Sequence, residues 1–173
     1  SYQVISKPFY DNRGAFLNLY RANEESYLGS WANYGINQVN LSETKKVGSI
    51  RGIHLQRKPH GEKKLIRCIK GEVWDIAVDL RDKSKTYGKW VSVRLSEKEN
   101  NGIIIPDGCA HGFQTLEPNS KLLYLHSGDW IPEAETGVRW NDPMLNIDWP
   151  LEISDISPRA VSYTHLTLPT MRT

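Results

Sequence analysis

The sequence has few cysteines, no long hydrophobic segment and no excess of charge of one sign. Its 173 residues include 2 cysteines, Cys68 and Cys109, which can form one disulfide at most. This count argues against a disulfide-stabilised scaffold. We therefore expect two reduced, buried thiols in a cytoplasmic protein.

The other absences concern membranes and nucleic acids. No apolar run approaches the roughly 20 residues that a membrane-spanning helix needs. Lys and Arg total 22 against 20 Asp and Glu, which gives a formal charge of +2. This balance argues against nucleic-acid and membrane-surface partners, because such proteins carry a basic stripe. Residues 1–4 lack a signal-peptide pattern, and the missing Met suggests a trimmed start.

Short strand-like segments separated by turn residues make up most of the chain. In the clearest one, Glu72–Leu80, the even positions are apolar and the odd positions are small or acidic. This alternation predicts a strand with one face in a core and the other toward solvent or a polar cavity. Further strands are expected at 65–69, 89–95, 102–105, 112–116 and 121–125, with short helical segments at 23–28 and 96–100. We therefore predict an all-β fold, an antiparallel jelly roll with a few short helices.

The last residues, 161–173, differ from the rest of the chain because they carry no charge before Arg172. They resemble translated cloning-adaptor sequence. We predict one domain over residues 1–160, followed by a non-native tail at 161–173.

Three residues are candidates for proton chemistry. Alternation places His54 on one strand face with Gly52 and Gln56, and Arg51 on the other face. A histidine among polar neighbours can act as a general base near neutral pH. Lys64, expected on an adjacent antiparallel strand, can stabilise an oxyanion in the same cavity. An isolated histidine or lysine of this kind is, however, more often purely structural or solvent-exposed.

Tyr124 is the third candidate, and it shares a strand face with Leu122 and His126. A tyrosine in a cavity can deliver a proton as a general acid. The alternative is a buried tyrosine whose hydroxyl simply finds a hydrogen-bond partner.

The segment Pro106–His111 resembles the P-x-G-x-x-H motif of the cupin superfamily. In metal-binding cupins, this histidine joins an H-x-H motif and a glutamate. Here His54-Leu55-Gln56 stands at that place, so one imidazole is missing and no nearby carboxylate completes the set. Because a transition metal needs three or four such ligands, we predict a metal-free cupin.

Taken in order, these segments resemble the dTDP-4-dehydrorhamnose 3,5-epimerase family from about Lys7 to Arg159. The most specific stretches are 51–56, 64–81, 88–91, 105–113, 137–143 and 147–150. The resemblance implies epimerisation at C3 and C5 of dTDP-4-keto-6-deoxyglucose, in dTDP-L-rhamnose biosynthesis. It implies no cofactor, because the C4 ketone acidifies both hydrogens through an enolate.

The resemblance also assigns roles to residues. It implies that His54 is the base, Tyr124 the acid and Lys64 the enolate-stabilising cation. It implies substrate contacts from Arg13, Gln38, Asn40, Arg51, Gln56, His111, Glu135 and Arg159. It further implies a homodimer in which the N-terminal segment of one subunit reaches the site of the other.

Three positions depart from the family pattern. Asn18 replaces a frequent Glu, and Trp130 replaces an aromatic residue that is commonly Tyr. Ala160 stands where the family usually has the Asp that orients the catalytic histidine, and loss of such an Asp can cost a factor of about 10⁴ in kcat. On alternation alone, Asp75 and Asp79 are possible substitutes for this Asp.

Several alternatives therefore stay open at the level of sequence. One is a monoepimerase acting at C3 or C5 only. Another is a sugar 3,4-ketoisomerase. A non-catalytic dTDP-sugar-binding cupin is favoured if Ala160 is genuine, and a metal-dependent cupin oxygenase ranks last.

Overall fold

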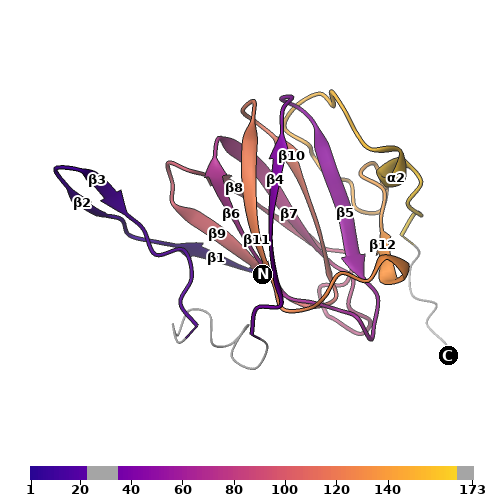
Figure 1. Cartoon of the computed structure of the whole chain (residues 1–173). Coiled ribbons are helices and arrows are strands. Elements are labelled where there is room, and N and C mark those ends of the chain that lie inside the picture. Colours follow the sequence, from indigo (N-terminus) through magenta and orange to yellow (C-terminus); the bar gives the residue numbers. More distant parts are fainter. Residues whose placement is uncertain (23–34, 167–173) are drawn as a thin grey trace.

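The computed structural model describes residues 1–22 and 35–166, so the helix expected at 23–28 lies outside the described residues. Two five-stranded antiparallel sheets face each other (Figure 1). The first contains, in spatial order, β1 (Tyr2–Ile5), β9 (Asn101–Ile105), β6 (Lys64–Lys70), β11 (Ser120–His126) and β4 (Gln38–Thr44). The second contains β12 (Glu135–Gly137), β5 (Ile50–Gln56), β10 (Cys109–Thr115), β7 (Glu72–Asp79) and β8 (Trp90–Ser96). The predicted all-β fold is confirmed.

The remaining elements are small. A hairpin of β2 (Phe9–Asp11) and β3 (Gly14–Phe16) projects away from the two sheets (Figure 1). Within residues 1–22 and 35–166, the helices are the 3-10 turn η1 (Pro132–Ala134) and α2 (Pro158–Val161). The short segment expected at 96–100 forms a single turn at residues 97–100, and the Ser96 hydroxyl accepts from the Glu99 amide at 3.1 Å. Among the described residues, no helix has the length and apolar character to cross a membrane.

Both faces of β7 are buried, and each face packs against a different part of the molecule. The odd positions Val73 and Ala77 enter the core between the sheets, which also holds Cys68 and Cys109 as free thiols. The even positions Ile76 and Val78 pack on the outer side, beneath Leu145 and its neighbours. Each fully buried aliphatic side chain of this kind contributes about 1.5–3 kcal/mol to stability.

The C-terminal segment lies against the second sheet as far as residue 166. Val138 and Thr164 form an isolated parallel β-bridge. The Arg139 Nε group donates to the Tyr163 carbonyl oxygen at 2.6 Å. These contacts concern residues 161–166 only, and the non-native origin of 161–173 stays a prediction.

A β-bulge on β5 decides which of its side chains face the interior. His111 pairs with His54, and Gly112 pairs with Gly52, so Ile53 has no counterpart on β10. Gly52 takes a φ of +98° and packs against β10, where a Cβ would lie 2.4 Å from the His111 carbonyl oxygen. The extra residue shifts the alternation by one, which is the usual effect of a bulge.

Replacement of this glycine tests the bulge. We expect Gly52→Ala to lower the free energy of unfolding by about 2 kcal/mol or more, from backbone overlap together with an unfavourable φ. Gly14→Ala is the matched control, since Gly14 also has a positive φ, +138°, yet a Cβ there meets no described atom within 4 Å. Chemical denaturation of both variants measures the difference, and equal losses would contradict this role for Gly52.

Candidate active site

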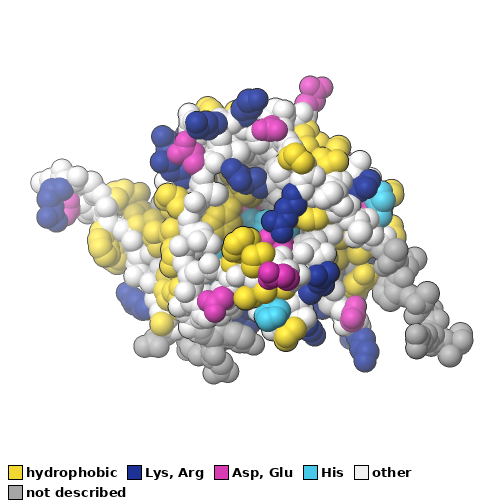
Figure 2. Space-filling model, turned by 45° about the vertical axis from the view of Figure 1, so that its right-hand side comes forward, with side chains coloured by type: hydrophobic (Ala, Val, Ile, Leu, Met, Phe, Trp, Pro, Cys, Tyr) yellow, Lys and Arg dark blue, Asp and Glu magenta, His cyan; other side chains and the backbone are white. Residues whose placement is uncertain are grey.

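A pocket of about 320 Å³ opens between the two sheets. The first sheet contributes polar side chains from β4, β6 and β11, and the second contributes others from β5, β10 and β12. On the face turned forward in Figure 2, basic, acidic and hydrophobic side chains all border a hollow in which a histidine surface is visible. The pocket is therefore polar, with cationic groups near its mouth.

Most of the side chains expected at a site meet in this pocket. Those that line it are His54, Lys64, Tyr124, Gln38, Asn40, Arg51, Gln56, His111, Glu135 and Arg159. Arg13 does not line it. Its guanidinium lies on the projecting hairpin, where it is 90% exposed and pairs with Asp11.

Two details of the expected arrangement are wrong. Arg51 lies on the pocket side together with His54, rather than on the opposite face, because the bulge at Ile53 shifts the alternation. Lys64 does not belong to a strand adjacent to His54, because β6 pairs with β9 and β11 in the other sheet. Lys64 and Tyr124 therefore face His54 across the gap between the sheets.

His54 is held in its uncharged form by its surroundings. Burial is the main cause that lowers its pKa well below the usual 6.5, and the nearby Lys64 and His111 lower it further. Within the described part of the chain, no hydrogen bond is found on the His54 ring. Ala160, on the helix α2 that contacts β5, also lines the pocket, and its side chain offers no acceptor. A neutral imidazole is free to accept a proton.

Neither Asp75 nor Asp79 replaces the missing carboxylate partner of His54. The Asp75 Oδ2 atom lies 2.7 Å from His111 Nε2, and both side chains are fully buried. Burial raises the pKa of Asp75 and lowers the pKa of His111, so each side chain is favoured in its uncharged form. Asp79 instead pairs with Arg81 at 2.9 Å, at the end of β7.

Tyr124, in contrast to His54, carries a proton that it can donate. Its hydroxyl lies 3.1 Å from the Ser42 hydroxyl, and burial raises its pKa well above the usual 10. The phenol therefore keeps its proton at neutral pH. Its ring stacks on His126 with a centroid distance of 5.9 Å and an interplanar angle of 14°.

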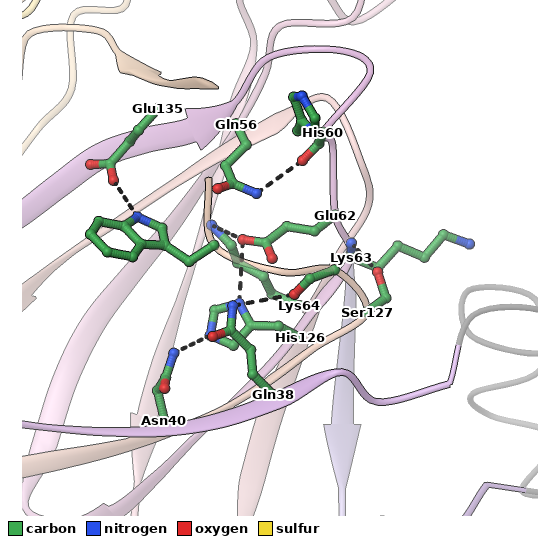
Figure 3. A network of polar contacts seen from close by, with 12 residues as sticks. Gln38, Asn40, Gln56, His60, Glu62, Lys63, Lys64, His126, Ser127 and Glu135 are labelled. Carbon is green, nitrogen blue, oxygen red and sulfur yellow. Dashed lines mark hydrogen bonds and ion pairs between the residues drawn. The ribbon is translucent and has the colours of Figure 1, made fainter. Parts of the chain in front are cut away.

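The sequence did not reveal Glu62 as a site residue. Its Oε1 atom lies 3.6 Å from Lys64 Nζ and 3.3 Å from His126 Nδ1 (Figure 3). Burial lowers the pKa of Lys64, and Glu62 opposes this effect. Glu62 belongs to no strand and to no periodic pattern, so alternation could not predict the direction of its side chain.

A second group of polar contacts lies at the pocket mouth. Glu135 accepts from Trp130 Nε1 at 3.0 Å and forms an ion pair with Arg159 at 3.0 Å. The Tyr163 hydroxyl donates to the same carboxylate at 3.3 Å. Tyr163 was also missed as a site residue, because it lies in the segment set aside as a tail.

The described residues contain no group of three or more His, Cys, Asp and Glu side chains placed to hold a metal ion. What they do contain is a neutral base, a protonated phenol and an ammonium group. These three groups are suited to moving a proton next to a carbonyl and stabilising the resulting charge.

Comparison with known proteins gives one consistent result. A family model described as dTDP-4-dehydrorhamnose 3,5-epimerase matches residues 1–167. The enzyme of that name from Methanothermobacter thermautotrophicus is 41% identical over 155 residues, covering 88% of this chain and 81% of the relative. The one from Pseudomonas aeruginosa is 44% identical over 147 residues, covering 83% and 78%.

The solved structures agree with the sequences. The crystal structure of dTDP-4-dehydrorhamnose 3,5-epimerase from Bacillus anthracis, with TDP and PPi bound, matches with a TM-score of 0.90 at 32% identity. This match covers 95% of this chain and 93% of the other.

The low pKa of His54 predicts the effect of restoring a carboxylate beside it. We expect Ala160→Asp to raise this pKa by about one pH unit or more, because a nearby anion favours the imidazolium. Titration of the His54 ring by NMR measures the shift. Ala160→Asn is the matched control, of similar size but uncharged, and should leave the pKa low. Equal His54 titration in the two variants would show that Ala160 does not face His54.

Proposed function

The chain belongs to the dTDP-4-dehydrorhamnose 3,5-epimerase family, and we propose that it epimerises C3 and C5 of dTDP-4-keto-6-deoxyglucose, toward dTDP-L-rhamnose. The observation that carries this proposal is the placement of His54 and Tyr124 on opposing sheets around one pocket. A carbon that loses a proton to one side and regains one from the other side is inverted.

The protonation states fit each step of this reaction. His54, uncharged because it is buried, takes a proton from C3 or C5. The electron pair left behind delocalises onto the C4 oxygen, where the Lys64 ammonium can stabilise the enolate. Tyr124 returns a proton to the same carbon from the opposite face and becomes a phenolate. The imidazolium then releases its proton to solvent and the phenolate takes one up from solvent, which restores the starting state.

The remaining pocket residues are suited to bind the substrate. A dTDP-sugar carries two phosphates, and the guanidinium groups of Arg51 and Arg159 at the pocket are appropriate partners for them. Gln38 and Asn40 offer amide groups for sugar and base. Gln56 does not offer donors, because its amide nitrogen already donates to the carbonyl oxygens of His60 and Asp129. His111, held by Asp75, presents its ring on the sugar side of the pocket.

We further propose that the protein is a cytoplasmic homodimer. The projecting hairpin exposes Phe9, Tyr10 and Phe16 by 72%, 75% and 69%, which a second copy can cover. Its position also explains why Arg13 is absent from the pocket of its own chain, since an exchanged hairpin can bring Arg13 to the partner's site. The free thiols of Cys68 and Cys109 fit a reducing compartment.

Hydrogen exchange in D2O tests the reaction directly. We expect deuterium to enter at both C3 and C5 of dTDP-4-keto-6-deoxyglucose. NMR of the sugar measures this incorporation. His54→Ala should slow this exchange by about a hundredfold or more, because the general base is removed. Tyr124→Phe should still permit exchange but impair inversion.

Other outcomes of this experiment separate the alternatives. Deuterium at one carbon only would identify a monoepimerase. No exchange with unchanged dTDP binding would identify a non-catalytic binder. Equal loss of exchange and inversion in Tyr124→Phe would assign Tyr124 a role other than the acid.

Mixing of two impaired variants tests whether Arg13 acts on the partner's site. Arg13→Ala should weaken nucleotide binding, and His54→Ala should remove the base. In a mixed dimer with exchanged hairpins, one site has both His54 and Arg13 intact, so activity should reappear on mixing. Light scattering checks the dimer. A dimer without recovered activity would place Arg13 outside the partner's site.

A further inference from the structure

Glu62 is a buried carboxylate to which the proton transfers above assign no part. It lies between β5 and β6, lines the pocket, and its side chain is only 7% exposed. One of its oxygens, Oε1, approaches both Lys64 and His126. The other, Oε2, is buried and has no hydrogen-bond partner among the described residues. Such a group is costly to bury, which calls for a compensating contact.

We propose that Glu62 is a positioning residue that holds the Lys64 ammonium charged and directed into the pocket. The role at the substrate rests on the proposed function, since it assumes that Lys64 meets the enolate oxygen. The ion pair between Glu62 and Lys64 does not depend on that function.

The contacts of Glu62 continue along one wall of the pocket (Figure 3). His126 Nε2 lies 3.2 Å from the Asn40 side-chain nitrogen. The His126 ring also stacks on Tyr124. Glu62 and Lys64 therefore lie at one end of a wall of polar side chains that continues through His126 on β11 to Asn40 on β4.

The charges around Lys64 show why the nearest carboxylate matters. Burial lowers the pKa of Lys64, whereas Glu62, Glu135 and Asp75 raise it, in that order. The other groups that face the pocket are basic or neutral: His54 on β5, His111 on β10, His126 and Tyr124 on β11, and Arg51 and Arg159 at the mouth. Of the three carboxylates, Glu62 alone forms an ion pair with Lys64.

The pH dependence of Lys64 acylation tests this role without any need for turnover. Only the neutral amine reacts with acetic anhydride, and mass spectrometry of the Lys64 peptide follows the rate. In Glu62→Gln, we expect the pH midpoint of Lys64 acylation to fall by about one pH unit or more, because the negative charge next to the ammonium group has been removed. Below the midpoint, labelling should then be about tenfold faster than in the wild type.

Two further variants complete the design. Glu62→Asp keeps the negative charge but places it farther from Lys64. Its midpoint of Lys64 acylation should therefore lie between those of the wild type and Glu62→Gln. The matched control is Glu43→Gln, which removes the partner of Lys121 in an exposed pair at 3.3 Å and should not change Lys64. If Glu62→Gln fails to fold, a midpoint of Glu62→Asp below that of the wild type still decides the question.

Activity gives a separate result. The alkaline limb of kcat should move to lower pH in Glu62→Gln by the same amount, with little change in KM. Unchanged labelling midpoints in folded Glu62→Gln or Glu62→Asp would overturn the proposal. A shifted midpoint in a protein without epimerase activity would instead leave the Glu62 ion pair standing and contradict the proposed function.

Discussion

Burial of ionisable side chains between the two sheets is the constraint on which the chemistry of this protein depends. Removal from water disfavours the charged form of every group, so one cause acts in opposite directions on different residues. It lowers the pKa of His54, which leaves a base able to accept a proton. It raises the pKa of Tyr124, which keeps an acid able to donate one. Lys64 is the exception that needs its charge in the proposed reaction, and the Glu62 carboxylate lies 3.6 Å from its ammonium group.

The arrangement of the two sheets determines the relative positions of these side chains, which burial alone does not. Because β5 and β11 belong to different sheets, His54 and Tyr124 approach the pocket from two sides. The bulge at Ile53 then adds Arg51 to the same interior face as His54. Between the sheets, the apolar part is filled by residues such as Ile66 and Phe113, whereas the part near β4 and β5 stays open and polar.

Local patterns of the sequence predicted the strands between residues 50 and 126 well, because alternation is a property of neighbouring residues. They did not predict β1 to β4 or β12. The strand at β7 was expected at 72–80 and occurs at Glu72–Asp79. The errors concern relations between distant segments. Alternation could not place Lys64 in the opposite sheet, could not pair Asp75 with His111, and could not give Glu62 a partner. At β5 it failed at a bulge, where Gly52 was the one local signal. The resemblance to a family, rather than periodicity, grouped ten of the residues that line the pocket.

The central claim is that the sugar is held between His54 on one sheet and Tyr124 on the other. A crystal structure with an unreactive dTDP-4-keto-6-deoxyhexose analogue tests it most directly. We expect a ring nitrogen of His54 within about 3.5 Å of C3 or C5, with the Tyr124 hydroxyl on the opposite face of the sugar ring and Lys64 Nζ next to the C4 oxygen. A sugar bound outside this pocket, or with His54 and Tyr124 on the same face, would contradict it.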